Sequence, residues 1–204
     1  MPKIHTITPY SLTKDLGRAY NEAMATIPDG DWACITDWDV LFLLPETIAH
    51  MHGDIERFPD TALFTCYASR SHANSVGQML PTGCSSTDSI IHHTNIAREQ
   101  TKHLYEVTEL NRVVSGYVML ISKETWLKYP FAQTGECLGV DSDFSKRLYK
   151  DGLKVRRMDG IYVWHTYRLY SDVKDTSHLK PAPEGKTVYT AIFGPYEKLK
   201  EPRI

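Results

Sequence analysis

Two aspartates separated by one residue, Asp37 and Asp39, are the residues of this sequence best suited to chemistry. They follow the apolar run 32–36, which predicts a buried strand, and precede a second apolar run at 40–44. Side chains at the carboxyl end of a strand in an open α/β sheet project into the crevice where ligands bind. Paired carboxylates there suit Mg²⁺ or Mn²⁺, which take oxygen ligands and share them with substrate phosphates. The pair therefore favours a metal-bound diphosphate, and the alternative is a solvated turn, where Asp is also common.

The elements that position this pair alternate between strands and helices. Periodicity and turn residues predict strands at 3–8, 32–36, 61–67, 113–121, 153–157 and 160–164. Helices are expected at 13–25, 46–57, 95–103 and 123–128, and again after 138–143, ending at Asp151 and Gly152. This alternation predicts an α/β fold.

The composition fits one main domain and excludes several classes of function. The chain has 204 residues with 23 Lys and Arg against 25 Asp and Glu, so the basic excess typical of nucleic-acid binding is missing. Its four cysteines are widely spaced and form no CxxC pair, which indicates neither a zinc knuckle nor a disulfide scaffold. We expect reduced thiols in a cytoplasmic protein, with peripheral membrane contact at most, because no stretch is apolar enough to span a bilayer.

Further polar residues follow later elements in chain order. Asp141 and Asp143 stand at the start of the late helix, where a carboxylate accepts backbone N–H bonds and complements the helix dipole whatever the function. His165 comes directly after the last predicted strand of the set. The order is thus an acidic pair, an acidic helix start and a histidine, each at the end of a strand or the start of a helix.

In this order the blocks resemble the GT-A glycosyltransferases, particularly enzymes of the family-2 type. The matching blocks are 17–23 (GRAYNEA), 32–39 (WACITDWD), 115–121 (SGYVMLI), 139–149 (GVDSDFSKRLY) and 163–165 (VWH). The resemblance covers about residues 3–168. It implies that residues 1–172 form a Rossmann-like, three-layer α/β/α domain with a mixed, mostly parallel central sheet.

The resemblance also assigns roles to individual residues. Asp39 and His165 would ligate Mn²⁺ or Mg²⁺, and Asp37 would lie near both the metal and the ribose. The donor-binding residues would be Thr8, Pro9, Tyr10, Asn21, Asp37 and Trp38. Asp141 stands where inverting members carry the carboxylate that takes the proton of the acceptor hydroxyl, a role that suits its chemistry.

The sequence departs from the family pattern in two places. Family members usually have a further strand and a base-reading Asp between the first strand and the Ala-x-Asn helix, whereas here only residues 9–18 separate strand 3–8 from Ala19. Val140 stands where an acidic residue often precedes the catalytic one. The base and the stereochemical outcome therefore stay open, with a uridine donor and inversion favoured.

Residues 173–204 are expected to form a linker and a short strand near 187–193. Two interpretations of this strand stay open. It begins another glycosyltransferase-like domain, in which case the chain is the amino-terminal part of a longer protein, or it adds an edge strand to the first domain.

The expected function is metal-dependent transfer of a sugar, of the hexosyltransferase type, from a UDP-sugar to a hydroxyl of a glycan or related acceptor, as in polysaccharide biosynthesis. Two alternatives remain. A metal-dependent nucleotidyltransferase or pyrophosphatase would also use paired aspartates and a diphosphate. A degenerate domain would bind a sugar nucleotide or a glycan without catalysis.

Overall fold

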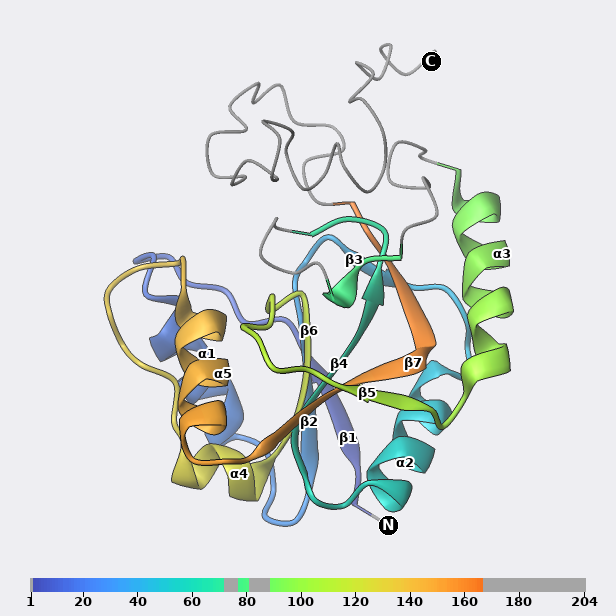
Figure 1. The fold of residues 1–204 in the computed structure, drawn as a ribbon. Coiled ribbons are helices and arrows are strands. Elements are labelled where there is room, and N and C mark those ends of the chain that lie inside the picture. The colour runs from blue at the N-terminus through green and yellow to red at the C-terminus, as the bar shows by residue number, and fades with distance from the viewer. Residues whose placement is uncertain (1, 72–76, 81–88, 167–204) are drawn as a thin grey trace, which may run out of the picture.

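The computed structural model describes residues 2–71, 77–80 and 89–166. Helices and strands alternate along much of this chain (Figure 1). In chain order the elements are β1 (Ile4–Ile7), α1 (Leu16–Ala25), β2 (Trp32–Thr36), β3 (Val40–Phe42), α2 (Thr47–Arg57), β4 (Thr61–Ala68), α3 (Ile90–Gln100), the 3₁₀ turn η3 (Thr101–His103), β5 (Val107–Glu109), β6 (Val118–Ser122), α4 (Lys123–Lys128), α5 (Val140–Lys150) and β7 (Lys154–His165).

The strands form one open, mixed, seven-stranded sheet. Its order is β1-β2-β6-β4-β7-β3, with β5 paired to β7 beside this path. The pairs β1–β2 and β4–β7 are parallel, whereas β2–β6, β4–β6, β3–β7 and β5–β7 are antiparallel. The α/β class and the mixed sheet are confirmed. The expected majority of parallel pairs is wrong, because β6 enters between β2 and β4 in the opposite direction and two short strands pair antiparallel with β7.

Helices cover both faces of the sheet, so the molecule has three layers (Figure 1). α1, α4 and α5 lie on one face and α2 on the other, and α3 packs against the second half of β7, where His93 contacts Tyr162 and Trp164. Alternate residues of β2 divide between the two sides: Ala33 and Ile35 belong to the apolar cluster that includes α1 and α5, and Cys34 to the cluster that includes α2. Burial on both faces explains why run 32–36 is mostly apolar and does not alternate with polar residues.

Two helices begin at different residues from those expected, and their caps explain why. The helix predicted at 13–25 begins later, because the Asp15 carboxylate accepts the N–H of Arg18 and caps α1 there. The helix predicted at 95–103 begins earlier and ends in the η3 turn, since Ser89 caps α3 upstream of the predicted start. A capping side chain thus sets each boundary.

The strand predicted at 113–121 is extended only in its second half, as β6. Before β6, the backbone N–H of Ser115 donates to Oε1 of Gln78 at 2.8 Å, and that of Gly116 donates to Oδ2 of Asp141 at 2.7 Å. These donors are satisfied by side chains instead of a neighbouring strand. The segment therefore leaves the sheet although its composition favours a strand.

The strands predicted at 153–157 and 160–164 are one continuous strand, β7. Asp159 and Gly160, which suggested a break, lie where the pairing with β4 shifts register. A β carbon at Gly160 would come within 2.6 Å of the Cα of Leu104, so glycine is required for this close approach of the η3 turn. Asp159 and Gly160 therefore mark a β-bulge within β7, and not the end of one strand and the start of another.

Strands β3 and β5 were not predicted, because three residues are too few to show a period. The other predicted elements are found with boundaries within a few residues. The linker and strand expected in 173–204 lie outside the described residues, and the division at residue 172 stays a prediction.

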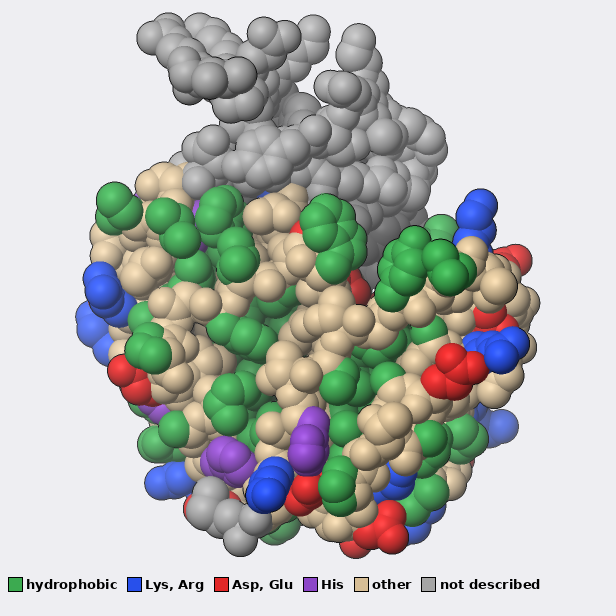
Figure 2. Space-filling model, turned by 180° about the vertical axis from the view of Figure 1, so that it is seen from behind, with side chains coloured by type: hydrophobic (Ala, Val, Ile, Leu, Met, Phe, Trp, Pro, Cys, Tyr) green, Lys and Arg blue, Asp and Glu red, His purple; other side chains and the backbone are tan. Residues whose placement is uncertain are grey.

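The surface carries both signs of charge. On the face shown in Figure 2, neither Lys and Arg nor Asp and Glu dominate, in agreement with the near balance of 23 and 25 such residues. Among the helices in the described part of the chain, none has the length and apolar character that a bilayer crossing requires.

Candidate metal centre

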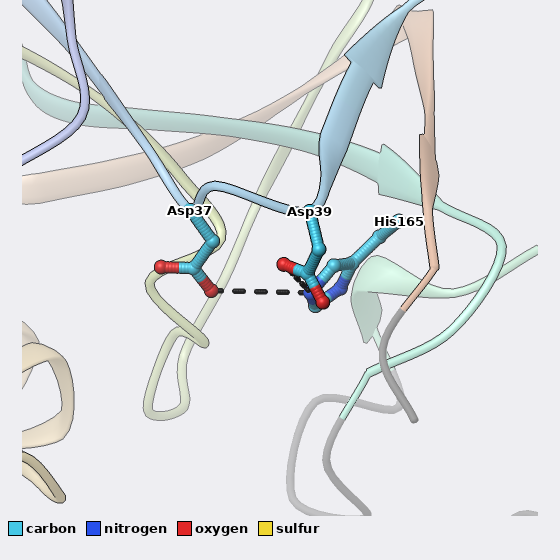
Figure 3. A group of neighbouring side chains, drawn as sticks. All are labelled: Asp37, Asp39 and His165. Carbon is cyan, nitrogen blue, oxygen red and sulfur yellow. Dashed lines mark ion pairs between the residues drawn. The ribbon is translucent and has the colours of Figure 1, made fainter. Parts of the chain in front are cut away.

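Strands β2, β3 and β7 bring the two aspartates to His165 (Figure 3). After β2 the chain turns, and the N–H of Val40 donates to the carbonyl of Asp37 at 3.3 Å. β3 then pairs antiparallel with the end of β7, where Val40 lies opposite His165. The N–H of Thr166 also donates to the carbonyl of Asp39 at 3.0 Å. The register of β3 on β7 therefore places Asp39 beside His165.

The three side chains point toward one another (Figure 3). One ligand atom from each lies within 4.8 Å of the other two. Nε2 of His165 is 3.2 Å from Oδ1 of Asp39 and 3.9 Å from Oδ2 of Asp37. The exposed fractions of the side chains are 3% for His165, 14% for Asp39 and 40% for Asp37, so the cluster opens to solvent at Asp37. Two carboxylates and one imidazole form a donor set that suits a divalent cation.

Hydrogen bonds hold His165 with Nε2 toward the acids. Its Nδ1 lies 2.8 Å from the carbonyl oxygen of Arg70. Because a carbonyl can only accept, Nδ1 carries a proton, and Nε2 is the ring nitrogen that faces the carboxylates. A lone pair on Nε2 would repel the acids, so a proton or a cation between the imidazole and the acids is favourable. A carbonyl that fixes the far nitrogen is also the usual support of a metal-ligating histidine.

Ser69 fixes the backbone of the same histidine. Its Oγ donates to the carbonyl of His165 at 3.0 Å and accepts the N–H of His165 at 3.1 Å. Ser69 is fully buried at the end of β4, next to the end of β7. Residues 69 and 70 thus hold both the main chain and the ring of His165.

The electrostatics favour a positive ion at this centre. Burial raises the pKa of the Asp37 carboxyl, the nearby His165 opposes this, and the negative charges of Asp39 and Asp141 raise the pKa further. A divalent cation would offset both the burial of the charge and the repulsion between carboxylates.

Asp141 approaches the centre from a different element, the first turn of α5. Its Oδ2 accepts the N–H of Gly116, and its Oδ1 accepts the N–H of Ser142, each at 2.7 Å. The carbonyl of Tyr117, the residue after Gly116, accepts the N–H of Asp37 at 3.1 Å, so Asp141 and Asp37 contact neighbouring residues at the start of β6. Asp143 instead forms an ion pair with Arg147 along the helix, with Nε and Oδ2 2.9 Å apart.

The other predicted donor-binding residues, Asn21 apart, lie on the two loops at this edge. Thr8 and Pro9 follow β1, and the hydroxyl oxygens of Thr8 and Thr36 are 3.0 Å apart where β1 and β2 end. Tyr10 is 81% exposed and Trp38 is 87% exposed. Both rings are therefore accessible for stacking on a ligand.

The side chain of Asn21 forms its hydrogen bonds away from the metal cluster. Its Oδ1 accepts from the indole N–H of Trp126 at 2.8 Å and from the N–H of Phe131 at 2.9 Å, and its Nδ2 donates to the carbonyl of Phe131 at 2.8 Å. These bonds fasten α1 to α4 and to the loop after it. The structure does not bring Asn21 into the metal cluster, and its role in donor binding stays a prediction.

Sequence reasoning did not find Ser69 or the carbonyl of Arg70. A carbonyl has no sequence signature, since every residue carries one, and a serine after a strand is common. The sequence does place both residues just after the strand predicted at 61–67. Residues that follow such strands are expected at the same edge of the sheet as Asp37 and Asp39. No protein-family model and no curated protein matches this chain, so the chemistry of the centre has to be inferred from its geometry.

Proposed function

We propose that the chain is a metal-dependent glycosyltransferase of the GT-A type, which moves a sugar from a nucleotide-diphosphate sugar to a hydroxyl of a glycan or related acceptor. The observation that carries the proposal is the cluster of Asp37, Asp39 and His165, with Nε2 of the histidine directed at both acids. Its place at the carboxyl ends of β2 and β7 supports a role in ligand binding. The resemblance of the sequence blocks supports UDP as the carrier.

Mn²⁺ fits this donor set better than Mg²⁺. Both ions accept carboxylate oxygens, but an imidazole ligand favours the transition metal. Asp37, Asp39 and His165 would hold the ion and leave positions for diphosphate oxygens. When bound, it would neutralise the negative charge that grows on the leaving diphosphate.

Asp141 supplies the base in this proposal. The bond between the anomeric carbon and the diphosphate oxygen breaks, the acceptor oxygen bonds to that carbon, and the acceptor proton passes to the Asp141 carboxylate. Two backbone N–H donors stabilise the ionised form of this carboxylate before it accepts the proton. Attack from the side opposite the diphosphate gives inversion.

Calorimetric titration of UDP into the purified protein tests the metal-bridged binding mode. We expect binding with Mn²⁺, weaker binding with Mg²⁺ and none in chelator. Asp39→Asn should abolish the metal-dependent binding, whereas Asp29→Asn, in the exposed turn before β2, should leave it unchanged. Equal affinity for UDP with Mn²⁺ and in chelator would contradict the proposal.

Turnover separates this function from the alternatives. Incubation with UDP-sugars and Mn²⁺ should release UDP by transfer or slow hydrolysis, and Asp141→Asn should lower the rate while UDP binding persists. Consumption of a nucleoside triphosphate with release of pyrophosphate would instead identify a nucleotidyltransferase. Tight UDP binding without turnover would identify a binding domain.

A further inference from the structure

Gly116 lies in direct contact with Asp141, where the chain enters β6. Its N–H donates to Oδ2 of Asp141 at 2.7 Å. A β carbon at this position would lie 2.9 Å from Cβ and 3.2 Å from Oδ2 of Asp141, and real contacts of a β carbon are essentially never shorter than 3.0 Å. The backbone of Gly116 does not have a positive φ. The need for glycine here is therefore one of space for Asp141.

The first turn of α5 is tied to the segment that contains Gly116. The buried Oγ of Ser145 accepts the N–H of Val114 at 3.2 Å and donates to a carbonyl in its own helix. From the other side, Oε1 of Gln78 accepts the N–H of Ser115 at 2.8 Å. These hydrogen bonds hold the segment before Gly116 in place. A side chain at position 116 would therefore displace Asp141 and not its own backbone.

The residue after Gly116 leads directly to the metal centre. The carbonyl of Tyr117 accepts the N–H of Asp37 at 3.1 Å, and its ring centroid lies 5.1 Å from that of His165. Tyr117 is itself fully buried, and its hydroxyl donates to the carbonyl of Cys66 at 2.6 Å. Gly116 therefore contacts Asp141 through its backbone, and Tyr117 contacts Asp37 through its carbonyl and His165 through its ring.

We infer that Gly116 is a positioning residue for the transfer reaction: its N–H orients the Asp141 carboxylate, and its missing side chain admits that carboxylate beside the metal centre. The inference rests on the proposed function, because the role of Asp141 as a base belongs to it. One short backbone segment then sets the separation between base and metal ligands. The three atoms nearest to a β carbon at 116 all belong to Asp141, so a larger residue there would displace the base first.

Kinetics of Gly116→Ala, Asp141→Asn and the double variant test this role. We expect about a 10- to 100-fold loss of kcat for Gly116→Ala, within the usual contribution of a positioned base, with the affinity for UDP and Mn²⁺ unchanged. The double variant should be no slower than Asp141→Asn, because both changes remove the same function. Losses that multiply in the double variant, or a fall in UDP affinity, would overturn the inference.

Two further variants serve as controls, one for folding and one for the position of the carboxylate. Gly77→Ala places a β carbon 3.3 Å from the end of the flexible Leu110 side chain and should leave kcat unchanged. Asp141→Glu moves the carboxylate without crowding position 116, and we expect it to lose kcat as Gly116→Ala does. Full activity of Asp141→Glu would contradict the need for a fixed carboxylate.

A measurement without turnover separates failure of the inference from failure of the proposed function. The ¹³Cγ chemical shift of Asp141 should change in Gly116→Ala, and its relaxation by bound Mn²⁺ should change as well, since the carboxylate moves. Absence of UDP-sugar turnover in the natural sequence would contradict the proposed function alone. An Asp141 signal that is identical in Gly116→Ala and the natural sequence would refute the positioning role whatever the reaction.

Discussion

His165 has different partners at its two ring nitrogens, and this asymmetry determines what the residue can do. Nδ1 donates to the Arg70 carbonyl, so Nε2 faces the acids and lies 3.2 Å from an oxygen of Asp39. A histidine that served only to pack would not need a ring nitrogen beside carboxylates. The side chain is almost fully buried, which strengthens its electrostatic interactions.

We expect His165→Gln to change metal preference as well as affinity. Glutamine replaces the ring nitrogen with an amide oxygen, so Mn²⁺ should lose more affinity than Mg²⁺ because the nitrogen ligand favours Mn²⁺. Titration of each ion into the variant and the natural sequence measures the ratio. If both ions lost affinity by the same factor, His165 would support the site without ligating the metal.

Ser69→Ala should weaken the site without removing a ligand. The change leaves the buried N–H of His165 without its Oγ acceptor, and support of this kind is typically worth a 10- to 100-fold change in metal affinity. We expect a loss of stability of about 1–3 kcal/mol as well. Ser122→Ala, which removes the cap of α4, is the matched control and should lower stability without altering Mn²⁺ affinity. Equal Mn²⁺ affinities in the two variants would count against the role of Ser69.

At the scale of elements, α2 carries a buried acid on its inner side. Asp54 is 1% exposed, and its Oδ1 has no hydrogen-bond partner among the described residues. Burial raises the pKa of this carboxyl to about 7, Arg57 opposes the rise, and the charge of Asp159 adds to it. The folded protein therefore binds this proton more tightly than the unfolded chain does.

The stability that Asp54 contributes should fall as pH rises. It is fully present below the ordinary pKa of Asp, near 4, and is lost by the time pH passes the folded value near 7. Asp54→Asn, which stays neutral, should therefore be more stable than the natural sequence at pH 8, by about 2–4 kcal/mol. Urea unfolding at pH 5 and pH 8 measures this difference, and the same difference at both values would exclude the proposed titration.

Asp60→Asn is a control in which the effect of pH on stability has the opposite sign to that of Asp54→Asn. Hydrogen bonds from Arg156 and Lys154 lower the pKa of the Asp60 carboxyl. Its contribution to stability is therefore present at neutral pH and lost as pH falls below the ordinary value. Asp60→Asn should be less stable than the natural sequence at pH 7, and this difference in the free energy of unfolding should disappear at acidic pH.

For the whole molecule, the metal would connect segments far apart in the chain. Asp37 and Asp39 come from the β2–β3 loop and His165 from the end of β7, so an ion bound to all three can bind only the folded state. At 100 times its dissociation constant, Mn²⁺ should raise the free energy of unfolding by about 2.7 kcal/mol. For a chain of this length that corresponds to a rise in Tm of roughly 5–10 °C.

Thermal unfolding with Mn²⁺ and with chelator measures this effect. Asp39→Asn should abolish the rise in Tm, and Asp29→Asn should retain it. Identical melting temperatures of the natural sequence in Mn²⁺ and in chelator would show that the cluster binds no ion at this concentration.

The sequence by itself determined the features that depend on near neighbours. The apolar run before Asp37 predicts β2, the spacing of Asp37 and Asp39 predicts a carboxylate pair at the end of that strand, and periodic apolar residues predict most helices. Each of these patterns is complete within a few residues, because side-chain direction repeats with the backbone. The resemblance added His165 and Asp141 to the candidate site, but no local pattern relates them to the acids.

Only the tertiary structure decided which distant residues meet. His165 reaches Asp39 through the register of β3, a strand of three residues that has no detectable period. Asp141 reaches the same edge because Gly116 leaves space for it. Asn21, which the resemblance placed at the donor, lies outside the metal cluster and hydrogen-bonds to Trp126 and Phe131. The reason is physical: pairing between remote segments depends on the sum of many weak packing and hydrogen-bond terms, and these exist only after the chain has folded.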